Sequence, residues 1–240
     1  MNSHKLKCIS VANIFLMMWA PSAFTFDCHP KISTQLPQYI LGYGSLIDEQ
    51  SKQKTDPTAE ESFPVFIKGY QRHWGAHGNL PGLNATFLSI VENHAASFNG
   101  IIYKLSHPNT IEQYDKRERI YCRKQLDAAQ LQTYNLTLPT EKQVWIYYAT
   151  QKANQPPSAD FPIVQSYVDI FIRECIQIEQ KFKIDGFAKN CINSTVQWSI
   201  HWENDRIFPR RPSFYEPFAP QIDALLKEEL PKMFAKIKYK

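Results

Sequence analysis

The stretch QYILGYGSL, residues 38–46, places a short apolar run directly before two closely spaced glycines. The run from Gln38 to Tyr43 predicts a buried strand that ends in glycine. Glycine is scarce, with 8 in 240 residues, and at Gly42 and Gly44 its small size lets the backbone approach a ligand closely. Consecutive N–H groups in such a turn can converge on an anion or a polarised carbonyl, although a tight structural turn explains the same residues.

Two enzyme motifs based on glycine-rich loops do not fit this turn. The third glycine of the dinucleotide-binding GxGxxG motif is absent, and no strand–helix–strand unit follows. Ser45 does not lie within GxSxG, so the turn does not match a serine-hydrolase nucleophile elbow.

Five further strands are expected from runs rich in Ile, Val, Phe and Tyr that are separated by Gly, Pro and Asn. They cover residues 64–70, 85–91, 98–105, 121–126 and 143–149. One helix, at about residues 106–118, precedes the fourth of these runs. Together they predict a curved or barrel-like sheet with one internal helix.

A proline-containing linker at residues 152–162 separates this region from the C-terminal part of the chain. After it, apolar residues recur at helical spacing over residues 163–178 and 222–233. We expect a mainly helical extension that packs on the sheet, not an independent domain.

Residues 1–22 have the layout of a secretory signal peptide. Lys5 and Lys7 precede an apolar run from Cys8 to Ala20, and small residues follow. The run is shorter than the ~20 residues that span a bilayer. We therefore expect cleavage near Ser22 or Ala23, export to the periplasm or outside the cell, and no stable membrane insertion afterwards. An uncleaved anchor or a leading core helix is the alternative.

The net charge argues against a nucleic-acid-binding protein, and the cysteines bear on disulfides and metal binding. Removing Lys5 and Lys7 with the signal peptide lowers the formal net charge from +4 to +2, which offers nucleic acid little attraction. The remaining cysteines permit disulfides in an exported protein: Cys28, Cys122, Cys175 and Cys191. The Cys175–Cys191 pair is favoured because it flanks an expected helix end and turn, and four buried thiols are the alternative. No CxxC pair exists, so zinc is not expected.

Glu118 is the candidate acid–base residue. On the expected helix, Ile111, Tyr114 and Glu118 occupy positions i, i+3 and i+7, so the three side chains share one face. The neighbouring Arg117 and Arg119 are better placed to face water. A carboxylate withdrawn from water has a raised pKa, which suits proton transfer near neutral pH. A solvated or salt-bridged residue at the helix end is the alternative.

The order of these motifs resembles the gamma-glutamylcyclotransferase-like family. Tyr-Gly-Ser-Leu at 43–46 follows the first strand, and Glu118 comes about 70 residues later with Tyr121 and Arg123 after it. Residues 69–72 and 99–103 resemble two further strand motifs of that family. The resemblance covers about residues 38–150.

This resemblance implies an α+β fold in which residues 36–150 form a small mixed β-barrel of about six strands flanked by helices. Residues 151–240 would be the helical C-terminal extension packed on it. Glu118 would be the catalytic acid/base, and Arg119-Ile120 replaces the Gly or Pro that often follows this glutamate. The implied substrate-binding residues are Tyr43, Gly44, Ser45 and Leu46, which hold a γ-glutamyl group through the backbone, and Tyr121 and Arg123, as pocket or support residues.

The implied reaction cleaves a γ-glutamyl amide by attack of its own α-amine, which releases 5-oxoproline and a free amine or amino acid. It needs a small-molecule substrate and neither a metal nor an organic cofactor. Two alternatives are a non-catalytic module that binds a γ-glutamyl-type small molecule and an acyltransferase that uses the same pocket. The sequence does not indicate the oligomeric state.

Three other groups of residues could carry chemistry. His73 and His77 have the spacing of metal ligands on a helix, but Gly75 between them favours a loop or strand end. Cys122 could be a nucleophile, although a buried thiol in a strand is expected. The polar and aromatic cluster at residues 195–210 could lock the structure through an Asp205 ion pair with Arg206 or Arg210. It could instead cap the cavity and bind a carboxylate through an arginine.

Overall fold

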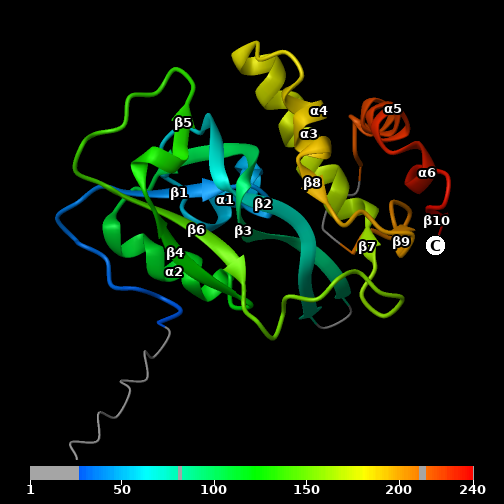
Figure 1. The fold of residues 1–240 in the computed structure, drawn as a ribbon, viewed down its shortest axis with the longest axis horizontal. Coiled ribbons are helices and arrows are strands. Elements are labelled where there is room, and N and C mark those ends of the chain that lie inside the picture. Colours follow the sequence, from blue (N-terminus) through cyan, green and yellow to red (C-terminus); the bar gives the residue numbers. More distant parts are fainter. Residues whose placement is uncertain (1–26, 81–82, 211–214, 240) are drawn as a thin grey trace, which may run out of the picture.

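Strand β1 (Gln38–Gly42), which the QYILGYGSL stretch predicts, lies in the middle of a mixed sheet (Figure 1). All five of its residues are buried. It pairs antiparallel with β3 (Leu83–Lys104) and parallel with β6 (Gln143–Ala149). The computed structural model describes residues 27–80, 83–210 and 215–239, and the predicted signal peptide lies outside them.

The sheet is a curled half-barrel, so the predicted α+β fold class is confirmed. Its edge strands do not pair with each other among the described residues, which leaves the barrel open. The strand order is β4 (Tyr121–Leu126), β6, β1, β3, β2 (Phe63–Leu80) and β5 (Leu131–Thr133), and β8 (Thr195–Val196) pairs with β2.

Strands β2 and β3 form one long hairpin that bends away from the central sheet toward the C-terminal helices (Figure 1). The bend falls where the register shifts between Lys68 and Tyr70. Gly69 has φ +86 there, a conformation that favours glycine. Separate strands at 85–91 and 98–105 were expected, but both belong to β3. That prediction is wrong because the strand continues through the interruption, where the register shifts and residues 93–96 lie opposite Gly69 alone.

Two short helices contact each other. Helix α1 (Glu49–Thr55) follows the turn η1 (Ser45–Ile47), and α2 (Ile111–Arg117) follows η2 (Pro108–Thr110). Ile111 and Tyr114 face inward, as the expected helical spacing predicts. The helix ends at Arg117, so Glu118 occupies the C-cap position.

The C-terminal extension is mainly helical, as expected, and it packs on the sheet in one continuous apolar core. Its longest element, α3 (Gln165–Phe182), has 18 residues and is buried along most of its length. Short strands add a second small sheet, which the helical spacing did not indicate. The remaining elements are η3 (Ala128–Gln130), β7 (Ile163–Val164), α3 (Gln165–Phe182), α4 (Phe187–Asn193), β9 (Trp202–Asn204), α5 (Ala219–Glu229), α6 (Pro231–Phe234) and β10 (Lys238–Tyr239).

Two disulfides join the described elements. Cys175–Cys191 links α3 to α4, which confirms the favoured pair. Cys28–Cys122 ties the N-terminal segment to β4. The alternative of four buried thiols is therefore wrong, and Cys122 has no thiol to act as a nucleophile. No helix within the described ranges is both long enough and apolar enough to span a membrane.

Candidate active site

The loop after β1 requires glycine at two positions because other groups approach too closely for a side chain. A Cβ on Gly42 would lie 2.4 Å from the carbonyl oxygen of Leu46. A Cβ on Gly44 would lie 2.7 Å from the hydroxyl of Tyr167, which α3 contributes. The loop closes into a turn where the Ile47 N–H donates to the Gly44 carbonyl at 3.0 Å. The predicted tight turn is therefore present.

This turn leaves three consecutive backbone donors free. The N–H groups of Gly44, Ser45 and Leu46 make no backbone or side-chain hydrogen bond within the described part of the chain. They begin a helical turn, where the first N–H groups have no partner inside the helix. The loop therefore has the donors that a substrate oxygen would need.

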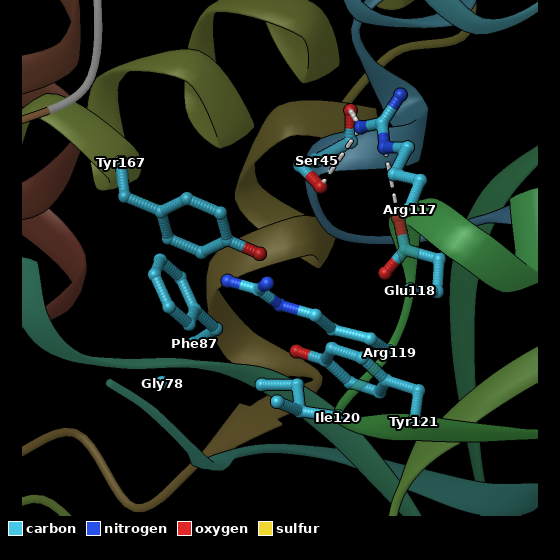
Figure 2. Close-up of a pocket in the computed structure, with 9 residues that line it drawn as sticks. All are labelled: Ser45, Gly78, Phe87, Arg117, Glu118, Arg119, Ile120, Tyr121 and Tyr167. Atoms are coloured by element: carbon cyan, nitrogen blue, oxygen red, sulfur yellow. Dashed lines mark hydrogen bonds and ion pairs between the residues drawn. The ribbon is translucent and has the colours of Figure 1, made fainter. Parts of the chain in front are cut away.

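Glu118 ends α2, and its carboxylate lies beside this loop (Figure 2). Only 8% of the surface of Glu118 is exposed, in agreement with the predicted inward placement. Arg117 Nε lies 2.9 Å from Glu118 Oε1, and Arg117 Nη2 donates to Ser45 Oγ at 3.2 Å. One guanidinium thus connects the carboxylate to the glycine loop, and the ion pair uses the deprotonated form of Glu118.

The expectation that Arg117 faces water is wrong. Its guanidinium also donates to the Ser51 carbonyl at 2.7 Å, to Ser51 Oγ at 2.6 Å and to Thr55 Oγ1 at 2.9 Å. These acceptors lie on α1, which the sequence did not place next to α2. Arg117 is a support residue of the site that helical spacing alone could not identify.

Two adjoining hollows meet at Glu118. The outer hollow has a volume of about 120 Å³, and the inner one has about 20 Å³. The inner volume is close to that of a single water molecule, so it suits one oxygen atom. The outer hollow is lined by Ser45, Gly78, Phe87, Arg117, Glu118, Arg119, Ile120, Tyr121 and Tyr167, and the inner one by Tyr43, Gly44, Ser45, Leu46, Leu88, Glu118, Tyr121, Tyr147 and Tyr167.

Tyrosine hydroxyls in the walls are held by backbone carbonyls. Tyr43 donates to the Tyr147 carbonyl at 2.6 Å, and Tyr121 donates to the Leu88 carbonyl at 2.9 Å. Burial raises the pKa of the Tyr43 hydroxyl well above its usual value, so this group stays protonated at neutral pH. These residues shape the hollow, and Glu118 is the carboxylate in it.

Arg123 lines neither hollow. Its guanidinium forms a two-point ion pair with Asp115, at 3.1 and 3.2 Å, and lies 4.3 Å from the ring centroid of Trp145. Asp115 also accepts from the Tyr147 hydroxyl at 2.6 Å. Of the two roles implied for Arg123, the geometry corresponds to support, because Arg123 fixes Asp115, which in turn accepts from the hydroxyl of Tyr147 in the wall of the inner hollow.

Two wall residues of the outer hollow come from segments that the motif analysis did not connect to the site. Phe87 lies on the distal half of the β2–β3 hairpin, and Tyr167 lies on α3; their ring centroids are 5.0 Å apart. The helical periodicity places Tyr167 on a buried face. It carries no signal that the buried face meets the glycine loop.

The two histidines lie on strand β2, so a helical metal site is absent there. His73 Nδ1 lies 2.9 Å from Gln197 Oε1. His77 Nε2 lies 2.7 Å from the Pro156 carbonyl, and its ring stacks on Phe161. No group of three or more His, Cys, Asp or Glu residues among the described residues could hold a metal ion.

The polar side chains of residues 195–210 hold the C-terminal extension together, but they pair with residues other than those expected. Arg206 forms two-point ion pairs with Asp169 and Asp223. Asp205 accepts from the Ser166 N–H and hydroxyl instead of pairing with the Arg206 side chain. Its hydrogen bond with Arg210 in the described structure comes from the backbone N–H of that residue, at 2.8 Å, and not from the guanidinium.

Three tryptophans and one arginine add further contacts to this cluster. Trp198 packs on Trp202 and Trp74, with ring centroids 5.1 Å away in each case. The Arg210 side chain pairs with Glu203. Arg206 and Arg210 line neither hollow at Glu118, so of the two interpretations of this cluster the geometry corresponds to the structural one and not to a substrate-binding arginine.

The chain is similar to several solved structures, all at low identity. A gamma-glutamyl cyclotransferase structure is 12% identical, with a TM-score of 0.49, over 64% of this chain and 85% of that one. YkqA from Bacillus subtilis is 17% identical, with a TM-score of 0.49, over 65% and 53%. A yeast gamma-glutamyl cyclotransferase specific to glutathione is 12% identical, with a TM-score of 0.43, over 66% and 95%.

No protein-family model matches the chain, and a comparison with curated protein sequences gives no match. The functional argument therefore rests on the residues of the site.

Proposed function

We propose that the protein is a cyclotransferase that cleaves a γ-glutamyl amide and releases 5-oxoproline and a free amine or amino acid. The observation that carries this proposal is the junction of the two hollows. There, the buried Glu118 carboxylate adjoins an oxygen-sized space next to the N–H groups of Gly44, Ser45 and Leu46, which have no hydrogen-bond partner among the described residues. The same residues carry the motif resemblance described above.

The first step needs a base. The substrate's α-ammonium loses a proton to Glu118, and the resulting amine attacks the γ-carbonyl carbon to close a five-membered ring. The carbonyl oxygen becomes an oxyanion in the inner hollow. Backbone donors aimed at such an oxygen each contribute about 3 kcal/mol in other enzymes, and Gly44, Ser45 and Leu46 are placed to supply them.

The second step needs an acid. Glu118 gives its proton to the leaving nitrogen, and the bond between the γ-carbon and that nitrogen breaks as the carbonyl re-forms. The ring nitrogen still carries a second proton from the original ammonium, which it passes through Glu118 to the released amine, so neutral 5-oxoproline and an ammonium ion leave. One C–N bond forms and one breaks, and no water is consumed. Because the attacking and attacked groups belong to one molecule, binding the folded conformer supplies a large part of the rate enhancement.

Arg117 positions the base in this mechanism and does not react. Its ion pair fixes the Glu118 carboxylate, and its bond to Ser45 Oγ sets the distance between carboxylate and loop. The site therefore needs no cofactor for proton transfer or for charge stabilisation.

Two other uses of the pocket remain distinct hypotheses. A binding module would hold the γ-glutamyl compound without turnover, and an acyltransferase would pass the γ-glutamyl group to an external amine. We also propose that the protein is exported to the periplasm or secreted. The two disulfides support this proposal because such bonds persist in oxidising compartments.

Incubating the purified protein with a panel of γ-glutamyl amino acids and amines, with detection of products by mass spectrometry, tests the proposal. Release of 5-oxoproline with an equal amount of free amine is expected. A binding module gives a thermal shift without product, and an acyltransferase gives a new γ-glutamyl amide only when a second amine is added. Either result would contradict the proposed reaction.

A further inference from the structure

Arg119 is a free cation at the mouth of the site. It is exposed, it lines the outer hollow and not the inner one, and it makes no hydrogen bond or ion pair to any described residue. Figure 2 shows its side chain reaching across the hollow, with the guanidinium directed toward Phe87 and Tyr167. Arg117, the other guanidinium of this hollow, is already committed to Glu118 and to α1.

The position of the scissile amide decides which part of a substrate reaches Arg119. The γ-carbonyl oxygen belongs in the inner hollow, and the α-amine must lie beside both the carbonyl carbon and Glu118. The α-carboxylate is attached to the same carbon as that amine, so it stays at the junction of the hollows. Only the leaving amine extends outward, past Ile120 and Phe87, toward the mouth.

A planar guanidinium at that point suits a carboxylate, which it binds through two parallel hydrogen bonds. We propose that Arg119 binds a carboxylate carried by the leaving amine. The preferred substrates are then γ-glutamyl amino acids or peptides, and γ-glutamyl amines without a carboxylate are poor substrates. The inference rests on the proposed cyclotransferase function and adds a specificity-determining residue to it.

The test compares two substrates that differ in one group. γ-Glutamylalanine and γ-glutamylethylamine have the same leaving nitrogen and the same two carbons, but only the first has a carboxylate. Arg119→Ala should lower kcat/KM for γ-glutamylalanine by about 10-fold, as expected for one charge-assisted contact. The value for γ-glutamylethylamine should change by less than about twofold, because that substrate never makes the contact.

Two further variants serve as controls. Lys116→Ala removes a positive charge three residues earlier, where the exposed side chain lines neither hollow. It should leave both substrates unaffected, which excludes a general electrostatic effect. Arg119→Lys keeps the charge without the planar fork and should retain part of the preference for γ-glutamylalanine.

The outcomes separate this inference from the proposed function. An equal loss for both substrates in Arg119→Ala would place the arginine on the γ-glutamyl half, and no loss would remove it from recognition. Either result overturns the inference while the cyclotransferase function stands. If the wild-type protein releases no 5-oxoproline from either compound, the proposed function fails and the inference fails with it. Melting temperatures of all variants confirm that each is folded.

Discussion

Replacing Glu118 by glutamine removes the proton-accepting group from the site with little change of shape. The glutamine side-chain oxygen can still accept from Arg117 Nε, which lies 2.9 Å from Glu118 Oε1 in the wild-type protein. The amide cannot take a proton from the α-ammonium or return one to the leaving amine. The substitution therefore separates proton transfer from the geometry that surrounds it.

The expected magnitudes follow from these contacts. Loss of a general acid–base group lowers kcat by about 10²- to 10⁴-fold, and the KM should change little because the loop donors and the aromatic walls remain. The lost charge pairing with Arg117 should reduce the free energy of unfolding by about 1 kcal/mol. Arg117 keeps its other acceptors at Ser45, Ser51 and Thr55, so no larger loss of stability is expected.

The assay is release of 5-oxoproline from γ-glutamylalanine, measured by mass spectrometry at saturating substrate, with the melting temperature recorded in parallel. Glu112→Gln is the matched control, because Glu112 lies in the first turn of the same helix and is exposed. It should keep wild-type activity. A Glu118→Gln protein that folds normally and retains kcat within about threefold of wild type would refute the acid–base role.

Three further predictions follow from particular contacts. In Gly44→Ala the new methyl group would lie 2.7 Å from the Tyr167 hydroxyl, so we expect about 1–3 kcal/mol of destabilisation and reduced 5-oxoproline release. Adding Tyr167→Phe should restore part of both. An unchanged rate of release in Gly44→Ala would contradict the close approach. Replacing Cys175 and Cys191 by serine should lower the free energy of unfolding in urea by about 3 kcal/mol, since the disulfide closes a short loop of sequence separation 16. An unchanged unfolding midpoint would contradict a stabilising role of this disulfide. Burial raises the pKa of Glu174 to about 7, so the folded protein holds a proton that the unfolded chain releases near pH 4.5, and stability should fall as pH rises from about 5 to 7. Glu174→Gln should flatten that fall in melting temperatures measured across this range, and an unchanged slope would rule out Glu174 as its source.

Local patterns in the chain were enough to locate the centre of the fold and the candidate base. The apolar run before Gly42 forms β1, and the spacing of Ile111, Tyr114 and Glu118 turns the carboxylate inward. Both predictions rest on neighbouring residues. A continuous apolar run is typical of a strand buried on both faces, and the helical period, carried one residue past Arg117 to the C-cap, sets the side on which Glu118 lies. The residues of the glycine loop follow the strand directly, so their position was equally local.

The same patterns misjudged features that depend on partners. The periodicity placed Arg117 in water, whereas α1 supplies acceptors that draw it into the site. The break between residues 91 and 98 suggested a turn, but β3 pairs with β2 on both sides of it and continues through a shift in register. A local pattern contains no information about which distant segment provides the other half of an interaction.

The amino-acid sequence by itself determined the central strand, the glycine turn and the inward-facing Glu118. The tertiary structure alone decided what surrounds them: Phe87 from the bent hairpin, Tyr167 from α3, the Arg117 bridge and the Cys28–Cys122 link. The physical reason is that burial periodicity is a property of neighbouring residues, while a cavity is defined by segments that only packing brings together. The position of the Arg119 guanidinium at the mouth of that cavity is a feature of the second kind.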